Sequence, residues 1–307
     1  MKTIPYGRNA IAALIGASVL LSMPSYVSAA QVTSEAQTMV TSSQQQPAFN
    51  PAWAKTSDGQ DIYFEDTRGE HPVIFFQSGF MGIHDLWKNQ VTALHGQYRT
   101  ITHDRRGYGL SSSPDDAAAY SVERNADDMK AVLDAAGISK PVYIVTHSMG
   151  SADTIAFAIK YPEMVKGIIM AGGASLSGEL PAKSGGTPDM FAVKNKTPQD
   201  SMNFFHGMGL EKEIAVEAGK WSRSVFRNQT VAILNYKNDP AAAGIKVPVL
   251  VLQGDDDAIQ PLKLPQEIVD TLPDARMEIL PGVKHFPPTE APDVVNNTIR
   301  NFIKQHP

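Results

Sequence analysis

The fold is decided by the stretch Val142-Tyr-Ile-Val-Thr-His-Ser-Met-Gly150. Its first four residues are apolar without alternation, which is typical of a strand buried on both faces of a sheet. Because the residues that follow predict a helix over 151–161, Ser148 is expected at a sharp turn between a strand and a helix. The compact Thr146 and the small Gly150 fit such a turn, which favours a nucleophile elbow over a simple helix N-cap.

Similar apolar runs recur along the chain, separated by amphipathic segments. The other runs that predict strands are 62–64, 73–76, 98–102, 167–170, 247–252 and 277–280. Apolar residues at spacings of three and four predict a helix from Val122 to Ala136, ended by Gly137, and another from Val294 to Ile303. This alternation predicts an α/β fold, with a mostly parallel sheet wrapped by helices.

One interval interrupts the alternation of strands and helices. Residues 174–246 contain no clear strand, and their large apolar side chains are spaced as in several short helices. We interpret these residues as a helical cap inserted into one α/β domain over 51–307, and not as a second domain.

The N-terminus has the three parts of a secretory signal peptide. Lys2 and Arg8 form a basic region, residues 11–21 are an apolar run, and small residues precede a cleavage site after Ala30. The apolar run is short for a membrane-spanning helix, although a retained anchor is the alternative interpretation. We therefore expect residues 1–30 to be removed and the mature protein to be periplasmic or secreted, with no stable membrane anchor.

The composition narrows the class of protein. The chain has no cysteine, which excludes a disulfide scaffold, a cysteine nucleophile, thiolate metal sites and iron–sulfur clusters. A net charge of −5 argues against general binding of nucleic acid, which needs a basic surface. No carboxylates or histidines are paired at a metal-ligand spacing, so we expect no metal ion. Residues 31–50 are rich in Gln, Ser and Thr and predict a flexible polar leader.

Two predicted loops carry the groups that a reactive serine needs. A serine hydroxyl is a weak nucleophile and requires a general base, which in turn requires an acid to orient it. His285 follows the last predicted strand, and the aspartates 255–257 follow the strand before it. The order serine, aspartate, histidine is the one expected when a triad is carried by an α/β sheet. These residues therefore predict nucleophilic catalysis by Ser148.

The elbow and a second motif resemble those of the α/β-hydrolase superfamily, in the branch with serine esterases and non-haem haloperoxidase-like enzymes. Members show G-H-S-M-G at the elbow, where residues 146–150 read Thr-His-Ser-Met-Gly. They show D-x-R-G-x-G-x-S after the fourth strand, and residues 104–111 read Asp-Arg-Arg-Gly-Tyr-Gly-Leu-Ser. The resemblance extends over about 61–303. It implies an eight-stranded, mostly parallel sheet flanked by helices, with the helical cap inserted after the sixth strand.

Two further motifs of the family select the partners of Ser148. The acid motif, G-x-x-D-x-x-x-P, falls on residues 254–261, so the resemblance selects Asp257 from the three aspartates. The histidine motif, with an acidic residue five positions after the histidine, matches His285 and Glu290. The resemblance thus implies a catalytic triad of Ser148, Asp257 and His285.

The resemblance also implies an oxyanion hole made of two backbone N–H groups, those of Phe80 and Met149. Gly79 lets the backbone approach the site closely. The family usually has His-Gly in the loop after the third strand, whereas this chain has Ser78 before Gly79. We expect this difference to alter the packing of the loop without removing a catalytic group.

The function implied is hydrolysis of a small or medium carboxylic ester through an acyl-enzyme, with no cofactor. A helical cap favours a small-molecule ester or lactone over a polymer, and Phe204, Phe205 and Met208 are candidates for the substrate pocket. Lactonase and carbon–carbon bond hydrolase are the alternative activities, and an inactive hydrolase-fold binding protein is the non-enzymatic alternative. Haloalkane dehalogenases and epoxide hydrolases share the fold that the resemblance implies, but they carry aspartate as the nucleophile. The serine at residue 148 therefore disfavours both activities.

We predict that the chain is exported and cleaved after Ala30, because its basic, apolar and small segments stand in the order that signal peptidase requires. Intact-mass measurement on the protein from a fractionated bacterial host should give an N-terminus at Gln31. The substitution Ala30→Arg should prevent this cleavage, so that the uncleaved chain is recovered. A wild-type protein of full mass in the membrane fraction would contradict the prediction and favour a tethered protein.

Overall fold

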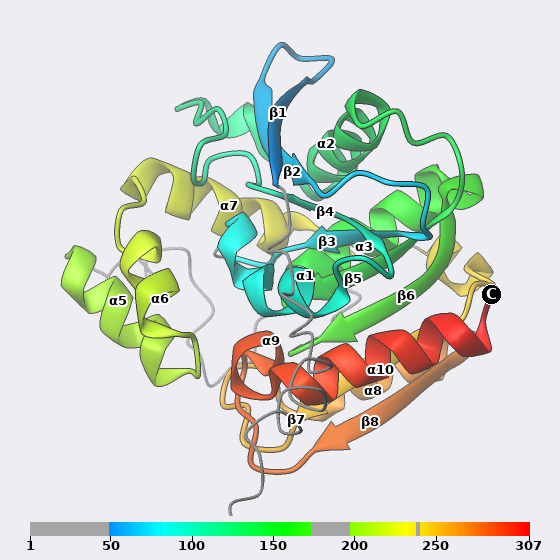
Figure 1. Ribbon diagram of the computed structural model, residues 1–307. Coiled ribbons are helices and arrows are strands. Elements are labelled where there is room, and N and C mark those ends of the chain that lie inside the picture. Colours follow the sequence, from blue (N-terminus) through cyan, green and yellow to red (C-terminus); the bar gives the residue numbers. More distant parts are fainter. Residues whose placement is uncertain (1–48, 81, 174–196, 238–239) are drawn as a thin grey trace, which may run out of the picture. The chain divides into compact units, whose positions relative to one another are not determined.

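The computed structural model describes residues 49–80, 82–173, 197–237 and 240–307 (Figure 1). The predicted signal peptide, almost all of the predicted leader and residues 174–196 of the predicted cap lie outside these ranges. None of the helices in the described ranges is long and apolar enough to cross a membrane.

An eight-stranded sheet forms the centre of the described chain, in the order β1-β2-β4-β3-β5-β6-β7-β8. Strand β2 pairs antiparallel with β1 and β4, and the remaining pairs are parallel. The predicted fold class is therefore confirmed. The strands are β1 (Asn50–Lys55), β2 (Asp61–Asp66), β3 (Val73–Gln77), β4 (Arg99–His103), β5 (Val142–His147), β6 (Val165–Ala171), β7 (Val249–Gly254) and β8 (Ala275–Leu280).

Helices cover both faces of the sheet. Side chains of α2, α3 and α8 belong to the hydrophobic cluster on one face, and those of α1 and α10 to the cluster on the other. Figure 1 shows α1 and α10 in front of the strands. The predicted helices near 122–136 and 294–303 are confirmed as α2 and α10. The bounds are α1 (Lys88–Leu94), α2 (Val122–Ala135), α3 (Gly150–Lys160), α8 (Lys263–Thr271), α9 (Pro287–Glu290) and α10 (Pro292–Gln305).

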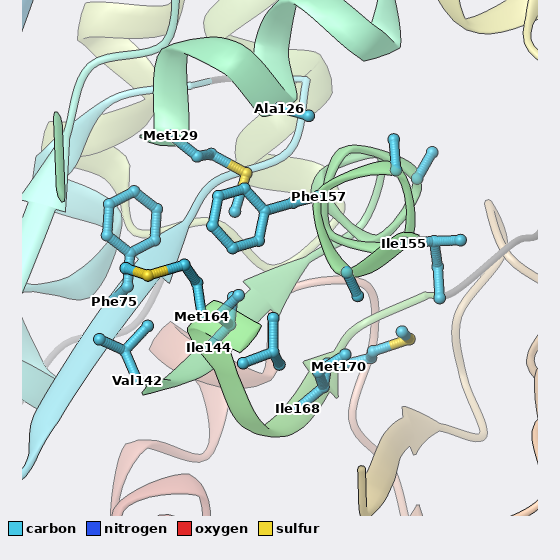
Figure 2. Close-up of a cluster of buried hydrophobic side chains, with 14 of the residues drawn as sticks. Phe75, Ala126, Met129, Val142, Ile144, Ile155, Phe157, Met164, Ile168 and Met170 are labelled. Atoms are coloured by element: carbon cyan, nitrogen blue, oxygen red, sulfur yellow. The ribbon is translucent and has the colours of Figure 1, made fainter. Parts of the chain in front are cut away.

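Strand β5 lies at the centre of the sheet and is buried along its whole length. Val142 and Ile144 face one hydrophobic cluster, and Tyr143 and Val145 face the other. Figure 2 shows Val142 and Ile144 in the first cluster, together with Phe157 of α3. Because helices cover both faces, every position of the strand is apolar or buried, which explains why its sequence shows no alternation.

Strand β1 is the strand that the sequence patterns miss. It lies at the edge of the sheet and its residues alternate in exposure, so it contains no continuous apolar run. Trp53 is 55% exposed and packs its ring edge-on against Tyr63 of β2, with ring centroids 5.2 Å apart. The strand begins at Asn50, at the end of the segment assigned to the polar leader.

Between β6 and β7 the described residues contain helices α5 (Pro198–Gly207), α6 (Lys212–Ala218) and α7 (Arg223–Asn235). Thr197 begins α5 with a capping box, in which its side chain and that of Asp200 bond each other's backbone N–H groups. The side chain of Glu211 pairs with Lys88 of α1 at 2.8 Å, which ties these helices to the α/β domain. No strand interrupts this part of the described chain, as the periodicity predicts.

We predict that Phe157→Ala lowers the free energy of unfolding by about 3–5 kcal/mol, because it leaves a cavity in the cluster on one face of the sheet. Phe157 is fully buried there, close to Met129 and Phe75 (Figure 2). Urea denaturation measures the change. The control Val294→Ala removes a side chain that is 47% exposed on α10 and should cost about 0.5 kcal/mol or less. Equal losses in the two variants would contradict the packing described.

Candidate active site

Ser148 lies at the turn between β5 and α3, with a left-handed backbone at φ 52°. Residues other than glycine rarely adopt this conformation, and they do so mainly where the surrounding structure imposes it. The turn is tight: a Cβ atom on Gly150 would lie 2.7 Å from both the backbone oxygen of Ser78 and the side-chain oxygen of Thr146. Only glycine therefore fits at residue 150, as the elbow motif predicts.

The structure brings Ser148, His285 and Asp257 into one hydrogen-bonded chain of buried side chains. The Oγ of Ser148 is 2.9 Å from Nε2 of His285, and Nδ1 of His285 is 2.8 Å from Oδ2 of Asp257. Because an ionised carboxylate can only accept, Nδ1 carries the ring proton and donates a hydrogen bond to Oδ2 of Asp257. With the proton on Nδ1, Nε2 is the nitrogen that can accept a hydrogen bond from the hydroxyl of Ser148.

The carboxylate of Asp257 is held by four hydrogen bonds. Oδ1 accepts from the backbone N–H groups of Ile259 and Gln260 at 2.8 and 2.9 Å, and Oδ2 accepts from His285 and from the Gln253 side chain at 2.9 Å. Burial by itself raises the pKa of Asp257, but His285 and these donors outweigh it and hold the pKa at about 2. Asp257 is therefore ionised throughout the physiological pH range. The contribution of Gln253, at the end of β7, was missed by the sequence analysis.

Three residues hold the loop of His285: His147 and Met208 from distant parts of the chain, and Glu290 from the helix that follows the loop. The ring of His147 shares a hydrogen bond of 2.8 Å between its Nε2 and the backbone oxygen of His285, and the backbone N–H of His285 donates to the backbone oxygen of Met208 at 3.2 Å. Burial lowers the pKa of His147 to about 3, so the ring is neutral and Nε2–H donates. The carboxylate of Glu290 accepts from the backbone N–H groups on both sides of His285, those of Lys284 and Phe286.

The loop after β3 lies directly against the turn of Ser148. A Cβ atom on Gly79 would lie 2.8 Å from the Cβ of Ser148, so glycine allows this close approach. Phe80 follows Gly79 in this loop. Met149 follows Ser148 and is the N-cap residue of α3. Ser78 donates to the backbone oxygen of Ile83 at 3.1 Å and accepts from the indole N–H of Trp87 at 2.9 Å. Ser78, which stands where the family usually has histidine, is thus hydrogen-bonded to residues that follow it within ten positions of the chain.

The three candidates for the substrate pocket lie in different surroundings. Phe205 is buried in an aromatic cluster, with its ring centroid 5.3 Å from that of Trp221, and Phe204 packs edge-on against Phe205. The same cluster includes Phe80, whose ring centroid is 4.8 Å from that of Phe226 of α7. Met208 contacts the loop of His285 through its backbone. The helices after β6 therefore touch both sides of the site, while the role of these three residues toward a substrate stays a prediction.

No group of three or more His, Asp or Glu side chains in the described ranges is arranged to hold a metal ion.

The fold and the order of these elements define the class of protein. Residues 72–215 match the profile of the alpha/beta hydrolase fold family. The resemblance to the α/β-hydrolase superfamily that the motifs predict is thus confirmed over residues 72–215.

Relatives in this family include esterases and haloperoxidases. The chain is 25% identical over 276 residues to a bifunctional esterase/perhydrolase of Acinetobacter calcoaceticus, covering 82% of this chain and 99% of the relative. It is 26% identical over 273 residues to a non-heme haloperoxidase of Rhodococcus erythropolis, covering 81% and 97%. A solved esterase of Exiguobacterium antarcticum has the same fold, with a TM-score of 0.74 and 19% identity over 83% of this chain and 100% of that one.

We predict that Ser148→Gly is more stable than Ser148→Ala by about 1 kcal/mol, because glycine adopts the left-handed backbone without the clash of a Cβ. Both variants lack the hydroxyl, so urea denaturation isolates the backbone effect. Ser151, a helical residue of α3, provides the control. Ser151→Gly should be less stable than Ser151→Ala by about 1 kcal/mol, and the same order at both positions would contradict the strained turn.

Proposed function

We propose that the protein is a serine hydrolase that cleaves a small or medium carboxylic ester through an acyl-enzyme intermediate. The observation that carries this proposal is the hydrogen-bonded chain from Ser148 through His285 to Asp257, with Nε2 of His285 turned to the hydroxyl. This is the arrangement that activates a serine hydroxyl as a nucleophile. The residues come from the loops after β5, β7 and β8, which meet at the carboxyl edge of the parallel strands.

In the first half of the reaction, Oγ of Ser148 attacks the ester carbonyl while Nε2 of His285 accepts the hydroxyl proton. The ionised Asp257 keeps the imidazole in the required tautomer and stabilises the imidazolium. The imidazolium then donates the proton to the leaving alcohol, and the acyl group stays on Ser148. In the second half, His285 takes a proton from water as the water oxygen attacks the acyl carbonyl. The imidazolium then donates this proton to Oγ of Ser148 as the bond to the acyl carbon breaks, which releases the acid and restores the hydroxyl.

The backbone N–H groups of Phe80 and Met149 are assigned to the negative oxygen of the tetrahedral intermediate. Met149 lies immediately after the nucleophile at the start of α3, where the backbone N–H groups have no partner within the helix. Gly79 allows the backbone before Phe80 to approach Ser148. Loss of one such donor typically costs about 10²–10³-fold in rate.

Carboxylic esters are the substrate class that the neighbourhood of the site favours. A relative that matches almost along its full length is named as an esterase/perhydrolase. Aromatic side chains gather beside Phe80, where Trp221 and Phe226 of the segment after β6 contact it. An apolar wall on this side suits the carbon chain of a small ester and not a charged substrate.

We predict that Ser148→Ala lowers the rate of hydrolysis of p-nitrophenyl esters by about 10⁴-fold or more, because it removes the nucleophile. A series of increasing acyl length, with simple lactones alongside, gives kcat/KM for each. A fluorophosphonate should modify wild-type Ser148, detected by mass spectrometry, and should leave the variant unmodified.

The matched control is Ser151→Ala, which removes a buried hydroxyl three residues further along, where it donates to the backbone oxygen of Gly173 at 3.1 Å. This variant should keep activity within about tenfold, since Ser151 takes no part in the chemistry. If the wild-type and Ser148→Ala proteins are equally active, or both inert and unlabelled, acyl transfer at Ser148 is wrong and a binding protein becomes the better explanation.

A further inference from the structure

The side chain of Arg105 is completely buried behind the loop that carries Phe80. It lies two residues after the end of β4, in the D-x-R-G-x-G-x-S motif. One guanidinium nitrogen donates to the backbone oxygen of Gly79 at 2.8 Å, and another donates to Oδ2 of Asp153 in α3 at 2.6 Å. A buried cation thus binds the peptide group that joins Gly79 to Phe80.

The geometry of this peptide group relates Arg105 to the proposed oxyanion hole. The described chain has no cis peptide bond, so the oxygen of Gly79 and the N–H of Phe80 point in opposite directions in one plane. Because Arg105 binds the oxygen, the N–H points away from Arg105. The same peptide lies against Ser148, since a Cβ on Gly79 would be 2.8 Å from the Cβ of the serine.

The guanidinium of Arg105 is held from behind by a network of buried side chains. Asp153 accepts from the Asn125 side chain at 2.9 Å through Oδ1, and from the Gln77 side chain at 2.8 Å through Oδ2. Asn125 belongs to α2, Gln77 ends β3, and Asp153 lies in the helix that begins after Ser148. With both carboxylate oxygens occupied, Asp153 holds the guanidinium in one position relative to the nucleophile.

We propose that Arg105 is a positioning residue for the oxyanion hole: its hydrogen bond to the Gly79 oxygen sets the direction of the Phe80 N–H and strengthens that N–H as a donor. This inference rests on the proposed acyl transfer at Ser148. A charged donor forms a stronger bond than a neutral one and polarises the peptide that accepts it. The effect is largest when negative charge develops on the substrate oxygen, which makes Arg105 act on the transition state.

The neighbouring Arg106 offers a matched control. It too is buried in the same loop and ion-paired, with Asp128 at 2.7 Å and with Asp58. Its side chain also donates to the backbone oxygen of Ala119, and its described bonds involve no residue of the loop after β3. Removing Arg106 therefore tests the loss of a buried ion pair from this loop without loss of the bond to Gly79.

The kinetic test compares the double variant Arg105→Met/Asp153→Asn with Arg106→Met/Asp128→Asn, so that neither leaves an unpaired buried charge. We expect the first to lower kcat about 10–100-fold with KM changed less than about threefold, a part of the loss seen when an oxyanion donor is removed. A trifluoromethyl ketone, whose adduct with Ser148 carries an oxyanion, should bind more weakly by a similar factor. The Arg106 variant should change neither value more than about threefold.

A second measurement does not depend on activity. Gly79-Phe80 is the single Gly-Phe step in the sequence. Labelling glycine with ¹³C at the carbonyl and phenylalanine with ¹⁵N therefore gives one carbonyl–amide correlation in the NMR spectrum, from this peptide alone. Loss of the charged donor should move the carbonyl resonance upfield in the Arg105 variant, and the Arg106 variant should leave it near the wild-type position.

The outcomes separate the inference from the proposed function. A folded Arg105 variant with wild-type kcat, ketone affinity and carbonyl resonance overturns the role of Arg105 and leaves the acyl transfer standing. An equal loss of activity in the Arg106 variant also overturns it, because the effect is then one of general stability. A wild-type protein that is inert toward esters and unlabelled at Ser148 overturns the proposed function, and the role of Arg105 with it.

Discussion

The arrangement of the site depends on one backbone constraint, the left-handed turn of Ser148 at the end of β5. Helices cover β5 on both faces, so a side chain within the strand is enclosed by the core. The turn carries Ser148 beyond the strand, to the edge where the loops after β7 and β8 supply Asp257 and His285. Glycines 79 and 150 stand on either side of the turn because a Cβ atom at either position would contact the neighbouring backbone. The same turn thus allows β5 to be covered on both faces and places Ser148 beside His285.

Polar side chains, most of them buried, hold the loops around this turn in one arrangement. The carboxylate of Asp257 accepts four hydrogen bonds, Glu290 binds the backbone beside His285, and Arg105 joins Asp153 to the loop of Gly79. A buried polar group that loses its partner costs free energy, and a buried charge costs more. Any displacement of these loops would break such bonds. The polar network therefore keeps Ser148, His285 and the candidate oxyanion donors in fixed positions relative to one another.

The elements that fill the interior could be predicted because burial leaves a periodic pattern in the sequence. The strands under the helices appear as apolar runs, and α2 and α10 appear as apolar residues three and four apart. Strand β1 could not be found in this way, because it lies at an edge and only Ala54 among its residues is buried. The contacts of His147 and Gln253 also left no pattern, since each side chain binds a partner that local periodicity does not indicate.

The sequence by itself indicated the strands and helices of the interior, the turn at Ser148 and the residue types of the candidate site. These features are local: periodicity, small residues at a turn and short motifs express them within a few positions. Only the tertiary structure decided that Asp257 meets His285 at 2.8 Å and that Arg105 lies behind the peptide of Gly79. These contacts join residues far apart in the chain, so their distances follow from the packing of whole elements against one another. The residues of the candidate site could thus be proposed from the sequence, whereas their geometry is a property of the folded chain.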